Sequence, residues 1–597
     1  MKSSIKAFAV VAAFGGIMWG GCLMNKTAAV VSGGLPQDVL DTCPITSTDF
    51  NTWFASGKAT QNGVVTPANS VTFQHRNNCD FYQWSERMFL WLTSPAPSNY
   101  GGGGTVMASP VFYDVSPEDS AGHRVLIPHV ANVPVSMTGH IVKNGPDRLP
   151  VIKDKSGKLF EVEDAKPTLK AKALVQSTAG AIEVDHVTED SKGVITFLDK
   201  ANNVIKNPKA ILRHKNSHMN ILERFAVGKK FVLLDANGNV VESEAGQATG
   251  DVLMDRNGSL VYYLSMVNDV YAWYLTGAYN QQLGDSQFPT TAGARDSICK
   301  IARANHKILP DSNALAMELK TSWVEASTLK DPQNYVTITA VIPTYDTTSK
   351  TKWVPNGHKT VKMAMIGVHI VGSVAGHPEM IWATFEQKNN TPNAAYAYVD
   401  VNHNVKQVPQ DTGSHWLFNT NTADTPYNNS HMQVQYFNNV ATDTIVAIHD
   451  TTISASNTLM TMPWGSAADS VTNPENKSSA ASNSEVIAVN NSIQKLLVGN
   501  DIRKNYLFIG ATWTSGGAPP NGKSYGAPDT TAGVAIGTNV LANTTMETYF
   551  QNPSRSCLFC HSNQETPSLT PGTLSHIYSA IQPLITMHDF MNKKKKK

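Results

Sequence analysis

Residues 360–387, TVKMAMIGVHIVGSVAGHPEMIWATFEQ, predict two strands that follow one another in the chain. Residues 360–374 and 379–387 are rich in β-branched and aromatic side chains, which favour extended backbone. Residues 376–379, GHPE, join the two runs. Side chains alternate along 361–374, so His369 shares one face with the other odd-numbered residues. The stretch therefore predicts a β structure with a histidine on one of its faces.

The same strand signal recurs on both sides of this stretch. Runs rich in β-branched and aromatic residues occupy 335–345, 433–437 and 506–514. Between about 125 and 263, short strands alternate with turns in which glycine follows aspartate by three residues; these turns begin at Asp154, Asp190, Asp235 and Asp255. They lack the later oxygen ligands and the closing glutamate of an EF-hand, so we interpret them as hairpin turns rather than calcium loops.

Helical periodicity is confined to a few segments. Residues 79–93, CDFYQWSERMFLWLT, place aromatic and apolar side chains at helical spacing. We also expect helices at 268–276, 294–306, 315–328 and, briefly, 544–551. The segments 466–484 and 516–531 are rich in small polar residues, proline and glycine, and predict surface loops.

Because strands outnumber helices, the sequence predicts an α+β protein with a mainly β body. We expect residues 30–540 to form this body from hairpins, short strands and a few helices, and a boundary near 265–330 could divide it into two subdomains. Residues 541–597 are expected to form a small helical C-terminal haem c segment with a lysine tail, for the reason given next.

The pentapeptide CLFCH, from Cys557 through Cys560 to His561, has the spacing at which two thiols bond to haem and the adjacent histidine ligates the iron. A redox CxxC pair would be expected within a βαβ pattern, and a zinc site would need a second ligand pair at similar spacing. Neither pattern is found in the sequence. The motif therefore predicts one covalent haem c, with His561 as the proximal ligand.

The sixth iron ligand is less defined by the sequence. His576 is the preferred candidate, at the start of a segment with apolar residues at helical spacing, and Met587, His588 and Met591 are the other local candidates. Because 36 residues follow His561, fewer than a self-contained cytochrome domain needs, the body should cover part of the porphyrin. A histidine of the body, or no sixth ligand, is also compatible with the sequence.

Residues 1–29 resemble an export signal, as thioether attachment outside the cytoplasm requires. Lys2 and Lys6 precede an apolar stretch, 7–19, that is short and glycine-interrupted for a membrane span. Cleavage before Cys22 would make a lipoprotein anchored by acyl chains, whereas cleavage after Ala29 would release a periplasmic protein. We expect a location in the periplasm, or on a membrane facing the periplasm or the exterior.

Three cysteines remain, Cys43, Cys79 and Cys299, and an oxidising compartment favours one disulfide among them. Proximity in the sequence favours Cys43 with Cys79, which would leave Cys299 buried and inert. The chain carries a formal net charge of +1, with 16% charged residues, so it has no field that would attract a nucleic acid. The tail at 593–597 could contact anionic lipid or an acidic redox partner, or remain a solvated end.

His377 is a further candidate, since a histidine with the carboxylates Glu379 and Glu386 near a haem could move protons or bind a metal. The sequence contains no HxH or HExxH spacing, and a histidine at a turn is more often a structural residue. No GxSxG, P-loop or dinucleotide fingerprint indicates another class of enzyme.

Several segments resemble those of exported bacterial single-haem proteins grouped as the cytochrome c family. They are NNCDFYQWSERMFLWLTSP at 77–95, LVYYLSMVNDVYAWYLTG at 260–277, ELKTSWVEA at 318–326, 367–387, and SCLFCHSN with LSHIY within 556–578. The resemblance spans nearly the whole chain and implies haem c and electron transfer outside the cytoplasm, with no established substrate. It also favours His576 over Met587 as a functional position.

Two functions follow as expectations. The first is a monohaem electron carrier that serves a redox partner protein. The second is a haem enzyme, peroxidase- or oxygenase-like, that uses an open iron site or a pocket in the β body. A weaker third hypothesis is a β body that binds a polymer or another protein, with the haem as an accessory.

Overall fold

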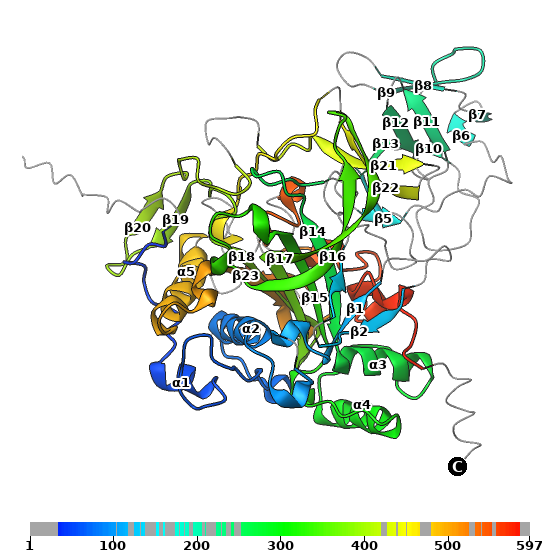
Figure 1. Ribbon diagram of the computed structural model, residues 1–597. Coiled ribbons are helices and arrows are strands. Elements are labelled where there is room, and N and C mark those ends of the chain that lie inside the picture. The colour runs from blue at the N-terminus through cyan, green and yellow to red at the C-terminus, as the bar shows by residue number, and fades with distance from the viewer. Residues whose placement is uncertain are drawn as a thin grey trace, which may run out of the picture.

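The computed structural model describes most of the chain between residues 34 and 585 (Figure 1). The described ranges are 34–102, 104–116, 124–131, 133–137, 195–205, 252–419, 427–437, 440–448, 451–465, 479–524, 532–538, 540–551 and 557–585, with short strands between 151 and 243. The expected export signal with Cys22, the lysine tail, and Met587, His588 and Met591 lie outside these residues.

A mainly antiparallel sheet of twelve strands organises the described residues. Its main path runs β2 (Leu126–Pro128), β1 (Phe112–Val115), β14 (Tyr262–Asn268), β15 (Met317–Glu325), β17 (Lys352–Val374), β18 (His377–Gln387), β23 (Tyr506–Thr514) and β24 (Ala535–Gly537). Off this path, β16 (Thr337–Asp346) pairs with β17 and β3 (Val135–Ser136), while β22 (Val440–Ala447) joins β21 (Met432–Phe437) to the start of β17. β14 and β15, at the two ends of the interval 265–330, are neighbours in this sheet, and helices lie between them in the chain.

The smaller strands between 151 and 243 form sheets of their own. β11 (Glu223–Val227), β12 (Lys230–Leu234), β13 (Val240–Ser243), β4 (Val151–Asp154) and β5 (Leu159–Glu161) make one of them. β10 (Lys209–Ala210), β6 (Leu174–Ser177) and β7 (Gly180–Glu183) make another, and β8 (His186–Glu189) pairs with β9 (Ile195–Leu198). β19 (Tyr396–Val399) pairs with β20 (Val405–Val408) near the helix α5 (Ser479–Leu496).

The strands predicted from residue composition are confirmed, and so is the turn at Asp255. Gly258 has φ +86°, its backbone N–H donates to the Asp255 carbonyl at 3.1 Å, and the Asp255 side chain accepts from the N–H of Ser259 at 2.8 Å. A Met254–Leu260 bridge closes this turn. The other three aspartate–glycine turns lie wholly or partly outside the described residues.

The helix predicted at 315–328 is wrong, because most of this segment forms β15, between β14 and β17. From Met317 to Lys320, buried and partly exposed residues alternate, which is a strand period. The backbone N–H and C=O groups of β15 form hydrogen bonds with both neighbouring strands, whereas in a helix they would pair within the segment. The predicted helices at 268–276 and 294–306 are confirmed as α3 (Asp269–Tyr279) and α4 (Ala292–Ala304).

One face of the sheet is covered by α2 (Asn78–Leu92), which confirms the predicted aromatic helix, and by α5 (Ser479–Leu496) (Figure 1). Phe89 stacks on Phe385 of β18 with ring centroids 4.3 Å apart. The segment 466–484 was expected to be a loop, but its end forms the start of α5. Asn490 joins α5 to β23 through two hydrogen bonds. Its side-chain N–H donates to the carbonyl oxygen of Phe508 at 2.7 Å, and its side-chain oxygen accepts from the N–H of Phe508 at 2.9 Å.

The other face meets α3, α4 and the C-terminal residues 557–585. Neighbouring residues of a strand point to opposite faces, so Ile370 and Ala383 join the core under α2, whereas Val371 and Trp382 join a second core with Leu558 and Leu574. The sheet therefore separates the aromatic core from the predicted haem motif.

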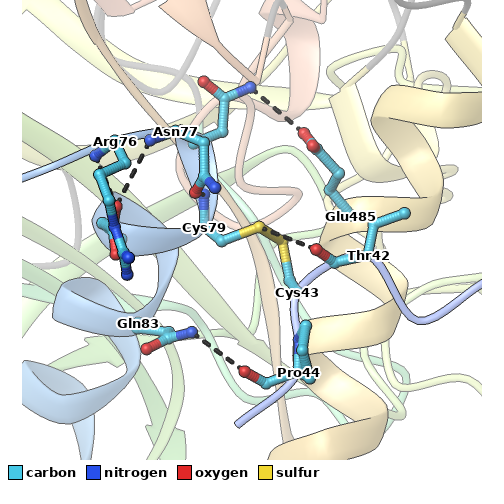
Figure 2. Close-up of a disulfide and its surroundings, with 10 residues drawn as sticks. Thr42, Cys43, Pro44, Arg76, Asn77, Cys79, Gln83 and Glu485 are labelled. Atoms are coloured by element: carbon cyan, nitrogen blue, oxygen red, sulfur yellow. Dashed lines mark hydrogen bonds between the residues drawn. A yellow bond between two sulfur atoms is a disulfide. The ribbon is translucent and has the colours of Figure 1, made fainter.

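The Cys43–Cys79 disulfide is confirmed and joins the N-terminal segment to the first turn of α2 (Figure 2). Glu485 of α5 lies beside it and accepts a hydrogen bond from the Asn78 side chain at 3.2 Å. Both sulfurs are engaged in the bond, so this cluster does not offer thiolate ligands to a metal. Cys299 is a free thiol and is only partly buried, rather than fully buried as expected.

The double substitution C43S/C79S should lower the free energy of unfolding by about 3–4 kcal/mol, since the bond closes a loop across 36 positions of the chain. Urea denaturation followed by circular dichroism would measure the loss. C299S is the matched control and should leave the urea midpoint nearly unchanged. Equal midpoints for C43S/C79S and the wild type would contradict a stabilising role for the disulfide.

Candidate functional site

The CLFCH motif forms a single helical turn, α6 (Cys557–Cys560), followed by His561. The N–H of His561 donates to the carbonyl of Cys557 at 3.0 Å, which closes the turn. Residues three and four apart lie on one side of a helix, so both thiols and the imidazole are gathered together. Leu558 is buried in the second core and anchors the turn, while Cys557 and Cys560 are outside any disulfide and are partly buried.

The imidazole of His561 is held in a defined orientation. Its Nδ1 lies 2.7 Å from the carbonyl oxygen of Leu574, and because a carbonyl can only accept, Nδ1 carries the proton. Nε2 therefore has the lone pair that a metal would use. The ring also packs against Trp382 of β18, with centroids 4.2 Å apart. Two segments of the protein thus fix the predicted proximal histidine.

His576 lies directly against His561. The two rings stack at a centroid distance of 4.0 Å and an interplanar angle of 14°, and Nε2 of His576 lies 3.2 Å from the carbonyl oxygen of Cys560. Two axial ligands approach one iron from opposite faces of the porphyrin, so face-to-face stacked rings do not have that geometry. His576 as the sixth ligand stays a prediction that requires its ring to leave the stack.

The segments around the motif are less helical than predicted. His576 follows the short helix α7 (Pro571–Leu574) and precedes one 3-10 turn, Tyr578–Ala580, so the helical return expected after His576 does not form within the described residues up to 585. In the predicted helix at 544–551, only Thr548–Phe550 forms a 3-10 turn. One helical-type bond, from the N–H of Glu547 to the carbonyl of Asn543, is present, and side-chain hydrogen bonds such as that of Thr544 with Glu386 join the segment to the sheet.

The sheet face that carries Trp382 also carries a row of polar residues. Lys320, His369 and Thr384 are paired across β15, β17 and β18, and Ser322, Gly367 and Glu386 occupy neighbouring positions on the same strands. Residues 543–547 cover this row. Gly367 permits their close approach, since a Cβ there would lie 2.8 Å from the side chains of Asn543 and Thr545.

The covering loop bonds to the row through charged groups. Nε2 of His369 lies 2.9 Å from Glu547, whose other oxygen accepts the N–H of Asn543 at 2.9 Å. Burial alone would raise the pKa of Glu547, but the charges of His369 and Lys320 outweigh burial and lower this pKa to about 2. Glu547 is therefore ionised at neutral pH and fixes the loop against β17.

On the same face, the pKa values of two other carboxyl groups are raised rather than lowered. Burial raises the pKa of Glu386 to about 7, although the N–H of Thr544 donates to it at 2.7 Å. Burial also raises the pKa of Glu318 to about 7, and this group accepts a hydrogen bond from Ser575 at 2.6 Å. Ser575 adjoins His576, so the C-terminal segment is tied to a carboxyl group that titrates near neutrality.

His377 belongs to a separate cluster. Its Nδ1 lies 2.8 Å from Glu379 and its Nε2 lies 3.2 Å from Nε2 of His75. Glu386, which the sequence grouped with His377, lies at the other end of β18. Neither His75 nor Glu547 was predicted as a site residue, because each meets its histidine partner across a long separation in the sequence.

Comparisons of the chain with family models, with curated proteins and with solved structures found no match. Among the helices of the described residues, none is both long enough and apolar enough to cross a membrane.

The pKa of Glu386 predicts how stability varies with pH. This pKa is raised on folding from 4.5 to about 7, so the neutral carboxyl stabilises the fold below about pH 4.5 and this contribution is lost as the pH rises through 7. The loss is at most about 3 kcal/mol. E386Q, which cannot ionise, should gain stability relative to the wild type by up to that amount between pH 4.5 and pH 8.

Urea unfolding of both proteins at the two pH values would measure this difference. The comparison at pH 4.5 is the internal control, because the carboxyl group is then neutral in the folded wild type. A difference between the two proteins that does not change with pH would contradict the raised pKa.

Proposed function

We propose that this chain is an exported monohaem c-type cytochrome that transfers electrons to or from a partner protein outside the cytoplasm. In this proposal Cys557 and Cys560 bind the haem covalently and His561 is an axial ligand. The observation that carries it is the Leu574 carbonyl, which accepts the Nδ1 proton of His561 and so places the lone pair on Nε2, the atom that would ligate iron.

The residues of the motif fit such a group. Neither thiol is in a disulfide, both lie on one helical turn with the histidine, and the histidine has the tautomer that ligation needs. Apolar side chains surround the turn: Leu558 and Trp382 on one side, and Met460, Ile509 and Leu541 beside Cys557. A haem bound there would supply a one-electron iron centre, while these side chains would exclude water and so influence its potential.

The alternative, a haem enzyme of the peroxidase- or oxygenase-like class, is favoured by one observation. The sheet face next to Trp382 holds His369 and, beside it, Glu318 and Glu386, whose pKa values are raised to about 7 so that they can exchange protons near neutral pH. In an electron carrier the same groups have a structural role, since they bind the covering loop and Ser575. The coordination of the iron distinguishes the two functions.

The wild-type protein should be expressed in a bacterium whose periplasm attaches haem. Its mass should then equal that of the processed chain plus one haem, and the pyridine haemochrome assay should be positive. C557S/C560S should have the mass of the chain alone. H561A should lose the axial histidine ligand, and a smaller fraction of the purified protein should contain haem. C299S is the control for loss of a thiol elsewhere and should keep the haem. A wild-type protein without haem would refute the proposal.

The ferric spectrum of the wild type tests electron transfer against catalysis. A carrier should be six-coordinate and low-spin, and its spectrum should not change with cyanide or peroxide. A high-spin iron that binds either ligand would favour the enzyme instead.

H576M tests the sixth ligand. An axial methionine raises the reduction potential relative to histidine, so the potential should rise if His576 binds iron. An unchanged potential would assign His576 to the role seen in the structure, in which it stacks on His561 and contacts the carbonyl of Cys560.

A further inference from the structure

Two histidines face each other on the aromatic side of the sheet. Nε2 of His75 lies 3.2 Å from Nε2 of His377, and the rings are inclined by 66° with centroids 5.0 Å apart. His75 is exposed in the segment before α2, whereas His377 is only 3% exposed at the start of β18. The pair therefore connects the interior to the solvent.

A buried carboxylate orients the inner histidine. Glu379 is fully buried, and its Oε1 lies 2.8 Å from Nδ1 of His377 and accepts the N–H of Thr514 at 3.1 Å. A carboxylate acceptor at Nδ1 places the proton there, so Nε2 of His377 presents its lone pair towards His75. Within the described residues, Oε2 of Glu379 has no hydrogen-bond partner, so an unsatisfied acceptor lies behind the imidazole.

We propose that His75 and His377 bind one divalent transition-metal ion, Cu²⁺ or Zn²⁺, through their Nε2 atoms, with Glu379 as the carboxylate that orients His377. Metal–nitrogen bonds of 2.0–2.1 Å in tetrahedral geometry place two ligating nitrogens roughly 3.3 Å apart. The observed separation of 3.2 Å matches this value. Both metals prefer imidazole ligands, and a carboxylate–histidine–metal arrangement is a recurrent design.

The hydrogen bond between the two rings is compatible with this role. Because Nε2 of His377 has the lone pair, Nε2–H of His75 donates in the metal-free pair. A bound cation would take the place of this proton, which would move to Nδ1 of His75 or to solvent. The exposed side of His75 leaves room for water to complete the coordination.

The test is metal titration of the full chain after removal of metal with a chelator. Competition with a chromophoric chelator should show one site for Cu²⁺ or Zn²⁺ whose affinity falls at least tenfold in H75A. E379Q should lose 10–100-fold, as expected for removal of a ligand's hydrogen-bond partner. Copper bound to the wild type should give an electron paramagnetic resonance signal from two imidazole nitrogens.

H358A, which removes an exposed histidine of β17, is the control and should bind like the wild type. Because His75 is exposed, H75A should fold normally, which circular dichroism would verify. Equal affinity of H75A and the wild type would overturn the proposal. A haemochrome assay on the same samples separates the two proposals: haem without metal binding refutes this site alone, and metal binding without haem refutes only the cytochrome function.

Discussion

The pairing of β17 with β18 is the constraint on which the rest of the structure depends. Every residue of β18 is buried, so both of its faces must be covered by other parts of the chain. A buried polar group needs a hydrogen-bond partner, and β18 contributes His377, Glu379, Thr384 and Glu386. Segments distant in the sequence provide the partners: His75 and Thr514 at one end, and residues 543–544 at the other.

The two faces of the sheet differ in the contacts they make. Under α2 aromatic stacks predominate, such as Phe81 on Trp513 at 3.8 Å, and the polar pair of His377 and Glu379 lies beside Phe81. On the opposite face, apolar residues surround the turn that carries Cys557 and His561, and the neighbouring positions hold ionisable groups under the covering loop. The proposed haem turn thus adjoins charged groups that would contribute to its electrostatic environment.

The sequence predicts much of this architecture because the relevant signals are local. The structure confirms the predicted strands of β17, β18 and β23, the aromatic helix α2 and the Cys43–Cys79 disulfide. The sequence predicts a helix in place of β15 because Glu318, Lys320 and Trp323 occur in a short run. Its period fits a helix or a strand unless the pairing strands β14 and β17 are known. The partners of His377 and His369 could not be predicted, because 302 and 178 positions separate the members of these pairs.

The late position of the covering segment in the chain has a consequence for biogenesis. A polypeptide made from its N-terminus completes β14 to β23 before residues 540–585 are available. Until they arrive, water reaches the face with Glu318 and Glu386, and both groups are ionised at neutral pH. Arrival of the last segment expels that water and raises both pKa values to about 7, so at neutral pH the final step of assembly is coupled to partial protonation of these two groups.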